Sequence, residues 1–449
     1  MIRSYFDKIR GNAVVFTETR GQRRIPYLSR RKLEALRDSR VRALIEYAAS
    51  TVPFYRDLFR KKAIDPRTIR TATDLGILPR LSREDVRMDP RRFLSSTRHG
   101  RNAVAFVTSG TTGTPLTVFH DQHSLLANIA YGERERAVIT RACGKGFGYR
   151  EMAIYYPGST SGKVWDFYRR KTWIPVRPQR LVLSVLDPHE QIIAAINRFR
   201  PDVLISYGSY LETFFRIVAR QGKTLHHPRL LISTAEAMSA EGKRFISDTF
   251  AIPTISHYNA VEAFKIGFVC EAQQGFHLHE DLCHVSIVDK AGNPVPDGQV
   301  GEVVITNLVN RGTVLLNYRL GDLASISTTV CGCGRNLRLL SELDGRKEDI
   351  IFLSNGNFIH PRAIWSVLKS RDEVIQGQLI QHEPLAFELR LVTGDQDAYR
   401  RVADGIVNDL QHMLGEAAVI DHAFWPRIET AKGGKFRQVI ALGAPKGLI

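Results

Sequence analysis

Apolar residues recur at spacings of three and four between residues 29 and 62, which is the spacing of one face of an α-helix. The positions that follow this spacing are Leu33, Leu36, Val41, Leu44, Ile45 and Ala48. Pro53 has no backbone N–H to donate, so we expect it to end this helix or to reset it. The pattern predicts a helical lead-in over about the first hundred residues.

From about residue 100 the pattern changes to short apolar runs that alternate with helical stretches. The runs include AVAFV, EMAIYY, RLVLSVL, DVLISYG, RLLISTAE and TISHYNA, and the helical stretches include HEQIIAAINRF and LETFFRIVARQG. Strands that alternate with helices are typical of a mostly parallel sheet covered by helices. We therefore predict the α/β class.

The last third of the chain has two further textures. Residues 284–330 are β-rich, with a turn at KAGNPVPDGQVG, and the hundred residues after DGRKEDIIF resemble a small α+β unit. We predict a large N-terminal domain over residues 1–345, which contains the mostly parallel sheets and a β-rich subdomain. A small α+β domain would then occupy residues 346–449.

Length and composition support a globular protein. The chain has 449 residues, of which 43% are hydrophobic, so it is long enough for a substantial core and more than one domain. No run of about 18 apolar residues is present, and the start MIRSYFDKIRG lacks the apolar region of a signal peptide. We expect a cytoplasmic protein with no membrane span.

The formal charge of +17 is unevenly distributed. Residues 1–100 contain 24 Lys and Arg against 11 Asp and Glu, a surplus of 13, whereas residues 346–449 contain 13 of each kind. Two interpretations stay open for the basic segment. It is either a solvated helical surface or a docking face for something acidic, such as a carrier protein, a nucleotide, a nucleic acid or anionic lipid.

The stretch AFVTSGTTGTPLTVFHD, residues 105–121, combines glycines with hydroxyl side chains between two apolar runs. Glycines let the backbone approach an anion, and Ser and Thr add donors, so the loop suits a phosphate. A nucleotide-triphosphatase P-loop would need a lysine, but Leu116 stands where that lysine would be expected. A cation for the phosphates must come from elsewhere in the chain.

Four further segments follow the loop in a fixed order: HYNAVEAF (257–264), NYRLGDLASI (317–326), DGRKEDIIF (344–352) and AKGGKFRQ (431–438). In this order the five segments resemble the adenylate-forming superfamily of acyl-CoA synthetases and aryl-acid ligases. The lead-in over residues 47–87, the loop without lysine and the CGCGR stretch at 331–335 are most similar to the branch of phenylacetate-coenzyme A ligases and of proteins of capsular polysaccharide synthesis.

The resemblance implies an ATP-dependent acid–thiol ligase. Such enzymes attack the α-phosphate of ATP with a carboxylate, which gives an acyl-adenylate and pyrophosphate, and then transfer the acyl group with release of AMP. The implied cofactors are ATP, Mg²⁺ and coenzyme A or phosphopantetheine. Because the first step brings anions together, positioning, a metal ion and cationic side chains carry most of the catalysis.

The resemblance also assigns site residues. The phosphate loop would comprise Thr108, Ser109, Gly110, Thr111, Thr112, Gly113 and Thr114. Glu262 would hold Mg²⁺, Tyr258 would stack on adenine beside Asn259, and Asp322 would bind both ribose hydroxyls. Arg346 would contact the ribose and phosphate region. Lys435, with Lys432 as the alternative, matches the family's mobile catalytic lysine and would supply the missing cation from the small domain.

The acyl group is expected near Tyr207, Gly208, Ser209, Tyr210, Ala235, Glu236 and His257. This chain departs from the family pattern at Asn259 and Val261, which changes the walls of that pocket, and at the hinge, where Glu348 stands instead of Asp or Lys. The resemblance favours an aromatic carboxylic acid as substrate, but these departures leave phenylacetate itself in doubt.

The five cysteines are too few for a disulfide framework. Cys331 and Cys333 form a C-x-C pair, and a zinc site would need two more ligands. Cys270 and His277 are available, and similar positions recur in the resembled branch. Three interpretations stay open: a structural zinc site, free thiols, or a redox role.

Two alternatives to a thiol ligase remain. The same adenylation chemistry can serve an amine or hydroxyl acceptor on a sugar or another metabolite. A non-enzymatic polyanion-binding protein is favoured only by the basic N-terminal segment, which lacks the interleaved aromatic residues of a nucleic-acid module, so no nucleic acid is expected. The implied partners are a small carboxylic acid and an acidic acyl carrier protein.

Overall fold

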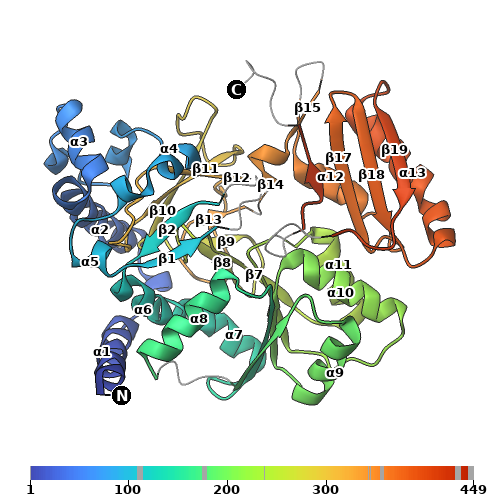
Figure 1. Ribbon diagram of the computed structural model, residues 1–449, viewed down its shortest axis with the longest axis horizontal. Helices are drawn as coiled ribbons and strands as arrows, with labels where there is room; N and C mark the ends of the chain where they lie inside the picture. Colours follow the sequence, from blue (N-terminus) through green and yellow to red (C-terminus); the bar gives the residue numbers. More distant parts are fainter. Residues whose placement is uncertain are drawn as a thin grey trace.

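The computed structural model describes residues 2–108, 115–173, 179–236, 238–341, 343, 345–353, 358–429 and 436–442. It consists of a large body and a smaller domain beside it (Figure 1). The smaller domain contains α12 (Pro361–Leu368), α13 (Gln396–Leu414) and the sheet of β17 (Gln376–Glu383), β18 (Ala386–Val392) and β19 (Val419–Phe424). Among the described residues, no helix combines the length and the apolar character needed to cross a membrane.

The helical lead-in is present. Its helices are α1 (Ile2–Thr19), α2 (Arg30–Thr51), α3 (Pro53–Lys61), α4 (Arg83–Met88) and α5 (Arg98–Arg101). Pro53 is the first residue of α3, where its missing N–H costs no hydrogen bond. Of the two outcomes expected for Pro53, the structure has the reset: α2 ends at Thr51 and a new helix begins at Pro53. The face predicted to be apolar on α2 is buried at Leu33, Val41, Leu44 and Ile45.

The centre of the large body is an eight-stranded sheet in the order β13-β9-β8-β7-β6-β5-β3-β4. Its strands are β3 (Arg150–Tyr155), β4 (Gln179–Ser184), β5 (Val203–Ser206), β6 (Leu230–Thr234), β7 (Thr254–Tyr258), β8 (Gly267–Val269), β9 (Phe276–Leu278) and β13 (Leu339–Leu340). The neighbouring strands β7, β6, β5, β3 and β4 pair in parallel. The strands β8, β9 and β13 extend the sheet beyond β7 with antiparallel pairing.

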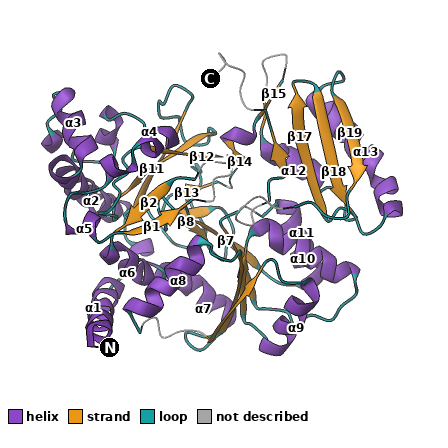
Figure 2. Ribbon diagram, in the orientation of Figure 1, coloured by secondary structure: helices purple, strands orange, loops and turns teal. Residues whose placement is uncertain are grey.

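Helices cover both faces of this sheet (Figure 2). The helices α6 (Gln122–Tyr131) and α7 (Glu133–Cys143) precede β3 in the chain. The helices that connect successive strands of the sheet are α8 (Thr160–Lys171), α9 (His189–Phe199), α10 (Gly208–Arg220) and α11 (Ala240–Phe250). On β3, Met152 and Ile154 pack against α9 and α10, whereas Ala153 and Tyr155 face the core shared with α7. The alternation is the two-residue period of a strand that is buried on both sides.

The β-rich subdomain is a four-stranded antiparallel sheet in the order β10-β11-β12-β14. Its strands are β10 (Cys283–Val288), β11 (Gly301–Asn307), β12 (Tyr318–Ala324) and β14 (Gly345–Arg346). β1 (Val104–Val107) and β2 (Thr117–His120) form a separate hairpin, and the segment predicted to be a phosphate loop connects them in the chain.

The small domain packs two helices, α12 (Pro361–Leu368) and α13 (Gln396–Leu414), on one mixed sheet. The strands are β17 (Gln376–Glu383), β18 (Ala386–Val392), β19 (Val419–Phe424) and β20 (Val439–Ile440), preceded by the hairpin of β15 (Ile351–Phe352) and β16 (Phe358–Ile359). The architecture confirms the predicted class: a helix-covered, mostly parallel sheet, an antiparallel subdomain and a small C-terminal α+β unit.

Charged groups connect the small domain to α10 of the large body. The ammonium of Lys369 lies 3.5 Å from a carboxylate oxygen of Glu212, and both side chains are buried. Arg216 donates to the main-chain oxygen of Asp372 at 3.2 Å. Because two buried charges need each other, these contacts favour one arrangement of the two parts.

Candidate active site

A cavity of about 670 Å³ opens where the carboxyl ends of β3, β5, β6 and β7 meet the small domain. Its walls come from α6, α7 and α8, from the ends of the parallel strands and from the antiparallel sheet. The small domain contributes Trp365 and Phe436. In open α/β sheets, this edge is where ligands bind, because loops rather than strands meet there.

At one end of the cavity, three predicted nucleotide residues form a bonded group. The hydroxyl of Tyr258 donates to Oδ2 of Asp322 at 2.7 Å, and Nε of Arg346 lies 3.2 Å from Oδ1 of the same carboxylate. The antiparallel register puts Asp322 directly opposite Arg346. Burial, with a further contribution from Asp322, raises the pKa of Tyr258 well above its ordinary value, so the phenol stays a donor.

Glu262 follows β7 in a tight turn and is 6% exposed. Its Oε1 accepts from the hydroxyl of Tyr318 at 3.2 Å, and its main-chain oxygen accepts from the side-chain amide of Asn307 at 2.9 Å. The amides of Ala260 and Ala263 each donate to the other's carbonyl, which closes the turn. These contacts leave carboxylate lone pairs directed at the cavity, which Glu262 lines.

The neck of the phosphate loop is fixed by Thr108. Its amide donates to the Leu116 carbonyl at 2.9 Å, and the Leu116 amide donates to the Thr108 hydroxyl at 3.0 Å. Leu116 is fully buried, so a lysine at this position would place its charge in the core. The predicted loop residues Ser109, Gly110, Thr111, Thr112, Gly113 and Thr114 lie outside the described residues, as do Lys432 and Lys435.

A cation that the sequence analysis missed lies at this neck. Arg83, the first residue of α4, donates through Nη2 to the hydroxyl of Thr108 at 2.8 Å and also lines the cavity. The two residues are 25 positions apart, so motif matching in either segment gives no signal of the contact. The structure thus brings a guanidinium to the loop that lacks the P-loop lysine.

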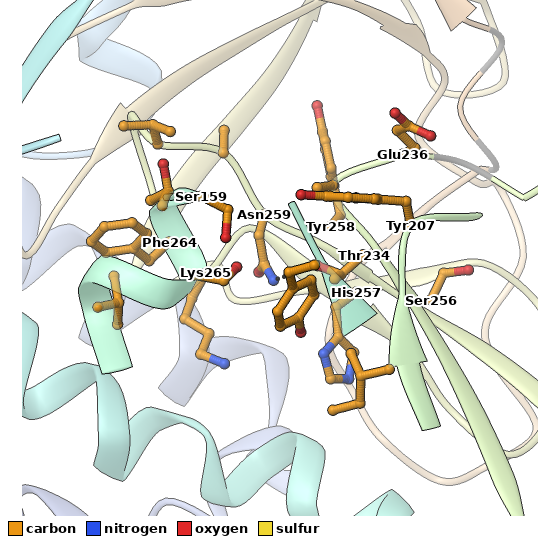
Figure 3. Close-up of a pocket in the computed structure, with 18 of the residues that line it drawn as sticks. Ser159, Tyr207, Thr234, Glu236, Ser256, His257, Tyr258, Asn259, Phe264 and Lys265 are labelled. Carbon is orange, nitrogen blue, oxygen red and sulfur yellow. Dashed lines mark hydrogen bonds between the residues drawn. The ribbon is translucent and has the colours of Figure 1, made fainter. Parts of the chain in front are cut away.

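The predicted acyl-side residues gather around the end of β7 (Figure 3). The hydroxyl of Ser209 donates to Glu236, whose other carboxylate oxygen accepts from the main-chain amide of Phe436 at 3.0 Å. Tyr207 and Ala235 line the same space, as do Asn259, His257 and Val261. Gly208 and Tyr210 lie at the start of α10 and are not among the residues that line the cavity.

Beyond Asn259 the cavity contains charges that no motif predicted. The ammonium of Lys265 donates to Glu135 of α7, and Nε2 of His279 lies 3.3 Å from the other carboxylate oxygen. Burial alone would raise the pKa of Glu135, but Lys265, His257 and His279 together hold it well below its usual range. Figure 3 shows Lys265 and His257 pointing to the side of the cavity away from Glu236.

The four predicted zinc ligands converge at the edge of the large sheet. The sulfurs of Cys270 and Cys331 are 3.6 Å apart, Sγ of Cys333 is 3.3 Å from Nε2 of His277, and all four ligand atoms lie within 4.8 Å of one another. Tetrahedral zinc with bonds of about 2.0–2.3 Å requires ligand atoms roughly 3.5–3.8 Å apart. The separations of 3.3 Å and 3.6 Å are close to this range, so the four ligands need to move only slightly to enclose a zinc ion. Among the described residues, this is the group whose donors suit a soft divalent metal.

The cluster lies behind the end of the cavity that Tyr258 and Asp322 line. His277 belongs to β9, and its neighbour Phe276 lines the cavity and packs 5.7 Å from the ring of Tyr258. Arg335, which follows the C-x-C pair, donates to Glu271 at 3.0 Å and is 2% exposed. The cluster therefore ties the loop between β12 and β13 to the strands that support Tyr258.

Comparisons with known proteins define the class. The model of the family described as AMP-binding enzyme matches residues 27–310, and that of the CapK C-terminal domain matches residues 351–441. The chain therefore belongs to the AMP-binding enzyme family of the adenylate-forming superfamily, as the sequence motifs predicted.

Individual relatives narrow the branch. A phenylacetate-coenzyme A ligase of Thermus thermophilus is 26% identical over 402 residues, covering 85% of this chain and 86% of the relative. The protein CapK of Staphylococcus aureus is 19% identical, covering 90% and 88%. A solved 2-hydroxyisobutyryl-CoA ligase in its postadenylation state matches with a TM-score of 0.74 at 16% identity, over 95% of this chain and 92% of the other; it supports the fold alone.

Proposed function

We propose that this chain uses ATP to convert a carboxylic acid into an acyl- or aryl-adenylate and then transfers the acyl group to a thiol of coenzyme A or of a carrier-protein phosphopantetheine. One observation carries the proposal. A single cavity brings Thr108, Glu262 and Asp322, which are far apart in the sequence, to one end of a space that extends past them. Relatives named phenylacetate-coenzyme A ligase support the reaction class.

In this proposal the nucleotide binds at the end that contains Asp322. Both oxygens of this carboxylate already accept from Tyr258 and Arg346, but each oxygen has a second lone pair for a ribose hydroxyl. Tyr258 flanks the adenine and is held in place by its own hydrogen bond. Arg346 contacts the ribose and phosphate region from β14.

Attack of a carboxylate on the α-phosphate requires that two anions approach each other, so cations must surround the phosphates. We assign Arg83 to this role because its guanidinium lies at the neck of the phosphate loop. Lys435 would act from the small domain, as the family pattern implies. Glu262 would hold Mg²⁺ together with the phosphates, because a single buried carboxylate at the cavity suits a cation that keeps most of its ligands from substrate and water. When bound, this metal would neutralise charge on the phosphates.

The Cys270, His277, Cys331 and Cys333 cluster would hold a structural zinc ion. Three thiolates and one imidazole make a closed set of four ligands, which leaves no position for substrate and therefore favours a structural role. Burial raises the pKa of Cys270 to about 12, so this thiol would be protonated without a metal, and metal binding would release its proton.

Acyl transfer to a bulky thiol requires access that the closed arrangement with the small domain limits, so we propose that the small domain moves. The domain boundary at 345–346 and the hinge at Glu348, in the short 3₁₀ helix Lys347–Asp349, belong to this proposal. The contact of Phe436 with Glu236 would form for adenylation and break for transfer.

The basic N-terminal segment bears on the acceptor. Arg30 pairs with Glu280 at 2.6 Å, and Arg40 pairs with Asp281 at 3.0 Å, so part of the surplus charge stabilises the contact of α2 with the large body. The positive charge that remains to attract an acidic carrier protein is correspondingly smaller. Transfer to a carrier protein should slow as salt rises if the remaining charges steer it.

The proposal is tested by exchange of pyrophosphate into ATP, which reports adenylation whatever the acceptor is. A panel of carboxylic acids should contain at least one that stimulates exchange well above the acid-free rate. Lys435→Ala should depress exchange by on the order of 100-fold while transfer from a preformed acyl-adenylate continues. Equal loss of both steps would refute the role of Lys435, and absence of acid-dependent exchange across the panel would refute adenylation.

A further inference from the structure

The cavity does not end at the acyl residues that the family pattern implies. The cavity continues along one face of β3, which presents Glu151 and Tyr155 to it. Tyr149, the residue before the strand, also lines the cavity. Tyr155 lies at the carboxyl end of the strand, and four residues of strand span about 13 Å. Glu151 therefore lies deep beneath the nucleotide end, under α7 and α8.

The floor of this extension is a buried ion pair. The parallel register places Glu151 opposite Arg180 of β4, and Nη2 of the arginine is 2.7 Å from a carboxylate oxygen. The side chains are 9% and 11% exposed, and the guanidinium carbon lies 3.7 Å from the centre of the Trp165 ring. Stacking and pairing together fix the plane of the guanidinium.

Arg180 is only partly satisfied. Its Nε and Nη1 are buried and have no hydrogen-bond partner within the described part of the chain. These two atoms carry three N–H donors and no acceptor capacity. Because a buried donor without a partner costs free energy, a ligand that offers an oxygen here gains an interaction that an apolar ligand cannot supply.

The charges around the cavity indicate which kind of oxygen is suitable. Three cations that line this part of the cavity are already paired: Arg180 with Glu151, Lys265 with Glu135, and Arg136 with Glu133 at 3.0 Å. A second carboxylate on the ligand would therefore be a buried charge without a counter-ion, which is costly. A hydroxyl or carbonyl oxygen accepts from Arg180 without adding charge.

We propose that the acid accepted by this cavity is an extended, flat acid with a neutral oxygen, a hydroxyl or a carbonyl, at the end opposite its carboxylate, and that Arg180 recognises this oxygen. The inference rests on the proposed function, which places the acid here. Tyr155, Tyr168 and Phe264 line the cavity, and aromatic walls suit an unsaturated or aromatic body. Arg180 is thus a specificity residue.

The test compares three acids of one shape. Cinnamate, 4-hydroxycinnamate and 4-carboxycinnamate differ only at the far end of the ring. Their binding is measured by calorimetry without ATP, so that the result is independent of adenylation. The wild-type protein should bind 4-hydroxycinnamate on the order of 10- to 100-fold more tightly than cinnamate, because the hydroxyl satisfies a buried donor. It should bind 4-carboxycinnamate more weakly than 4-hydroxycinnamate.

Two variants locate the effect. Arg180→Met alone leaves Glu151 buried without a partner, so the double variant R180M/E151Q, which removes both charges, is tested beside it. In either variant that folds, the preference for 4-hydroxycinnamate over cinnamate should shrink to about twofold or less. The matched control is R169M/D166N, which removes an exposed pair from α8. It should keep the wild-type preference.

Equal affinity of the wild-type protein for cinnamate and 4-hydroxycinnamate would overturn the inference, as would a preference that survives in R180M/E151Q. Tighter binding of 4-carboxycinnamate would overturn the neutral-group part. Pyrophosphate exchange by the wild-type protein is measured separately with the same acids. Failure of exchange would refute the proposed function, whereas the binding preference decides the role of Arg180.

Discussion

The two ends of the cavity differ in how completely their polar groups are satisfied. At the nucleotide end, Asp322 accepts from Tyr258 and Arg346, and Glu262 accepts from Tyr318. At the far end, two buried nitrogen atoms of Arg180 have no hydrogen-bond partner among the described residues. The same is true of Nε2 of His257. A group of side chains that is already hydrogen-bonded suits a ligand that is the same in every reaction cycle. Donors without a partner instead favour an acid whose oxygen can accept their hydrogen bonds.

The largest effect should follow from loss of Asp322. Asp322→Ala removes the acceptor for two ribose hydroxyls and leaves the Tyr258 hydroxyl without its partner. Since a hydrogen bond to a charged group contributes about 1.5–3 kcal/mol, the KM for ATP in pyrophosphate exchange should rise on the order of 100-fold. The affinity for the acid, measured without ATP, should stay near the wild-type value, because that end of the cavity is untouched.

Asp297→Ala is the control, since Asp297 is a half-exposed aspartate paired with Arg338 at 2.7 Å. It should leave the ATP dependence unchanged. A normal ATP dependence in Asp322→Ala would show that the nucleotide does not bind at this end. A parallel loss of acid affinity would show that the two ends are not independent.

The next largest effect concerns Glu262. Glu262→Gln keeps the size of the side chain and its contact with Tyr318 but removes the negative charge. The Mg²⁺ concentration needed for half-maximal exchange should rise by roughly tenfold or more, because hard cations prefer charged oxygen ligands. A magnesium titration of exchange measures this shift. The exposed Glu190→Gln serves as the control. An unchanged magnesium requirement would remove Glu262 from the metal site.

The residues at the Asp322 end of the cavity could be listed from the sequence and those at the far end could not, for a physical reason. Asp322 and Glu262 lie in contiguous motifs whose local turns and strand ends place them, so their presence at one cavity could be predicted. Arg180 meets Glu151 only through the register of two parallel strands, and Lys265 meets Glu135 only through the packing of α7 on the sheet. Arg83 reaches Thr108 in the same non-local way.

The fold shows the same division. The α/β class, the lead-in helix and its reset at Pro53 follow from local spacing, and the structure has them. The buried pair of Lys369 and Glu212, which joins the small domain to the large body, could not be predicted from the pattern of apolar and polar residues. This pair depends on how the two domains pack against each other. The domain boundary, the hinge and the roles of the site residues stay predictions.

A smaller and more specific effect is expected at the cysteine cluster. Cys331→Ser should abolish about one equivalent of bound zinc and lower the melting temperature by several degrees, since a closed metal site contributes to folding. Because His277 adjoins Phe276 behind Tyr258, residual activity should show a raised KM for ATP with an unchanged preference among acids.

Metal analysis of the purified protein measures the zinc content. Cys143→Ser is the matched control: this cysteine is also buried but lies on α7, outside the cluster, so the variant should keep its metal. A wild-type protein that is fully active without metal would leave only the free-thiol interpretation.

The smallest effect is a pH dependence at His120, which supports the turn that carries Glu262. Its Nε2 must donate to the Val261 carbonyl at 2.7 Å, since a carbonyl only accepts, and its ring stacks on Phe264 with centres 4.2 Å apart. Burial lowers the pKa of His120 to about 4, although the hydrogen bond to Val261 and the nearby Asp121 oppose this shift. Between pH 6.5 and pH 4, His120 is therefore protonated in the unfolded chain but not in the folded chain. The contribution to stability is complete above pH 6.5 and falls by up to about 1.4 kcal/mol per pH unit between pH 6.5 and 4.

His120→Gln can keep a donor to Val261 but cannot titrate. We expect the variant to be less stable at pH 8, because it loses the stacking on Phe264, and to lose less stability than the wild type between pH 6.5 and 4. Urea unfolding at a series of pH values measures both. The two proteins share every other histidine, so the difference between the two curves isolates His120. Parallel curves for wild type and His120→Gln would mean that folding does not shift the titration of His120, because its ring reaches water in the folded protein. Its hydrogen bond would then not be what holds the Glu262 turn, and the rigidity of the nucleotide end would have to come from the contacts of Asn307 and Tyr318 alone.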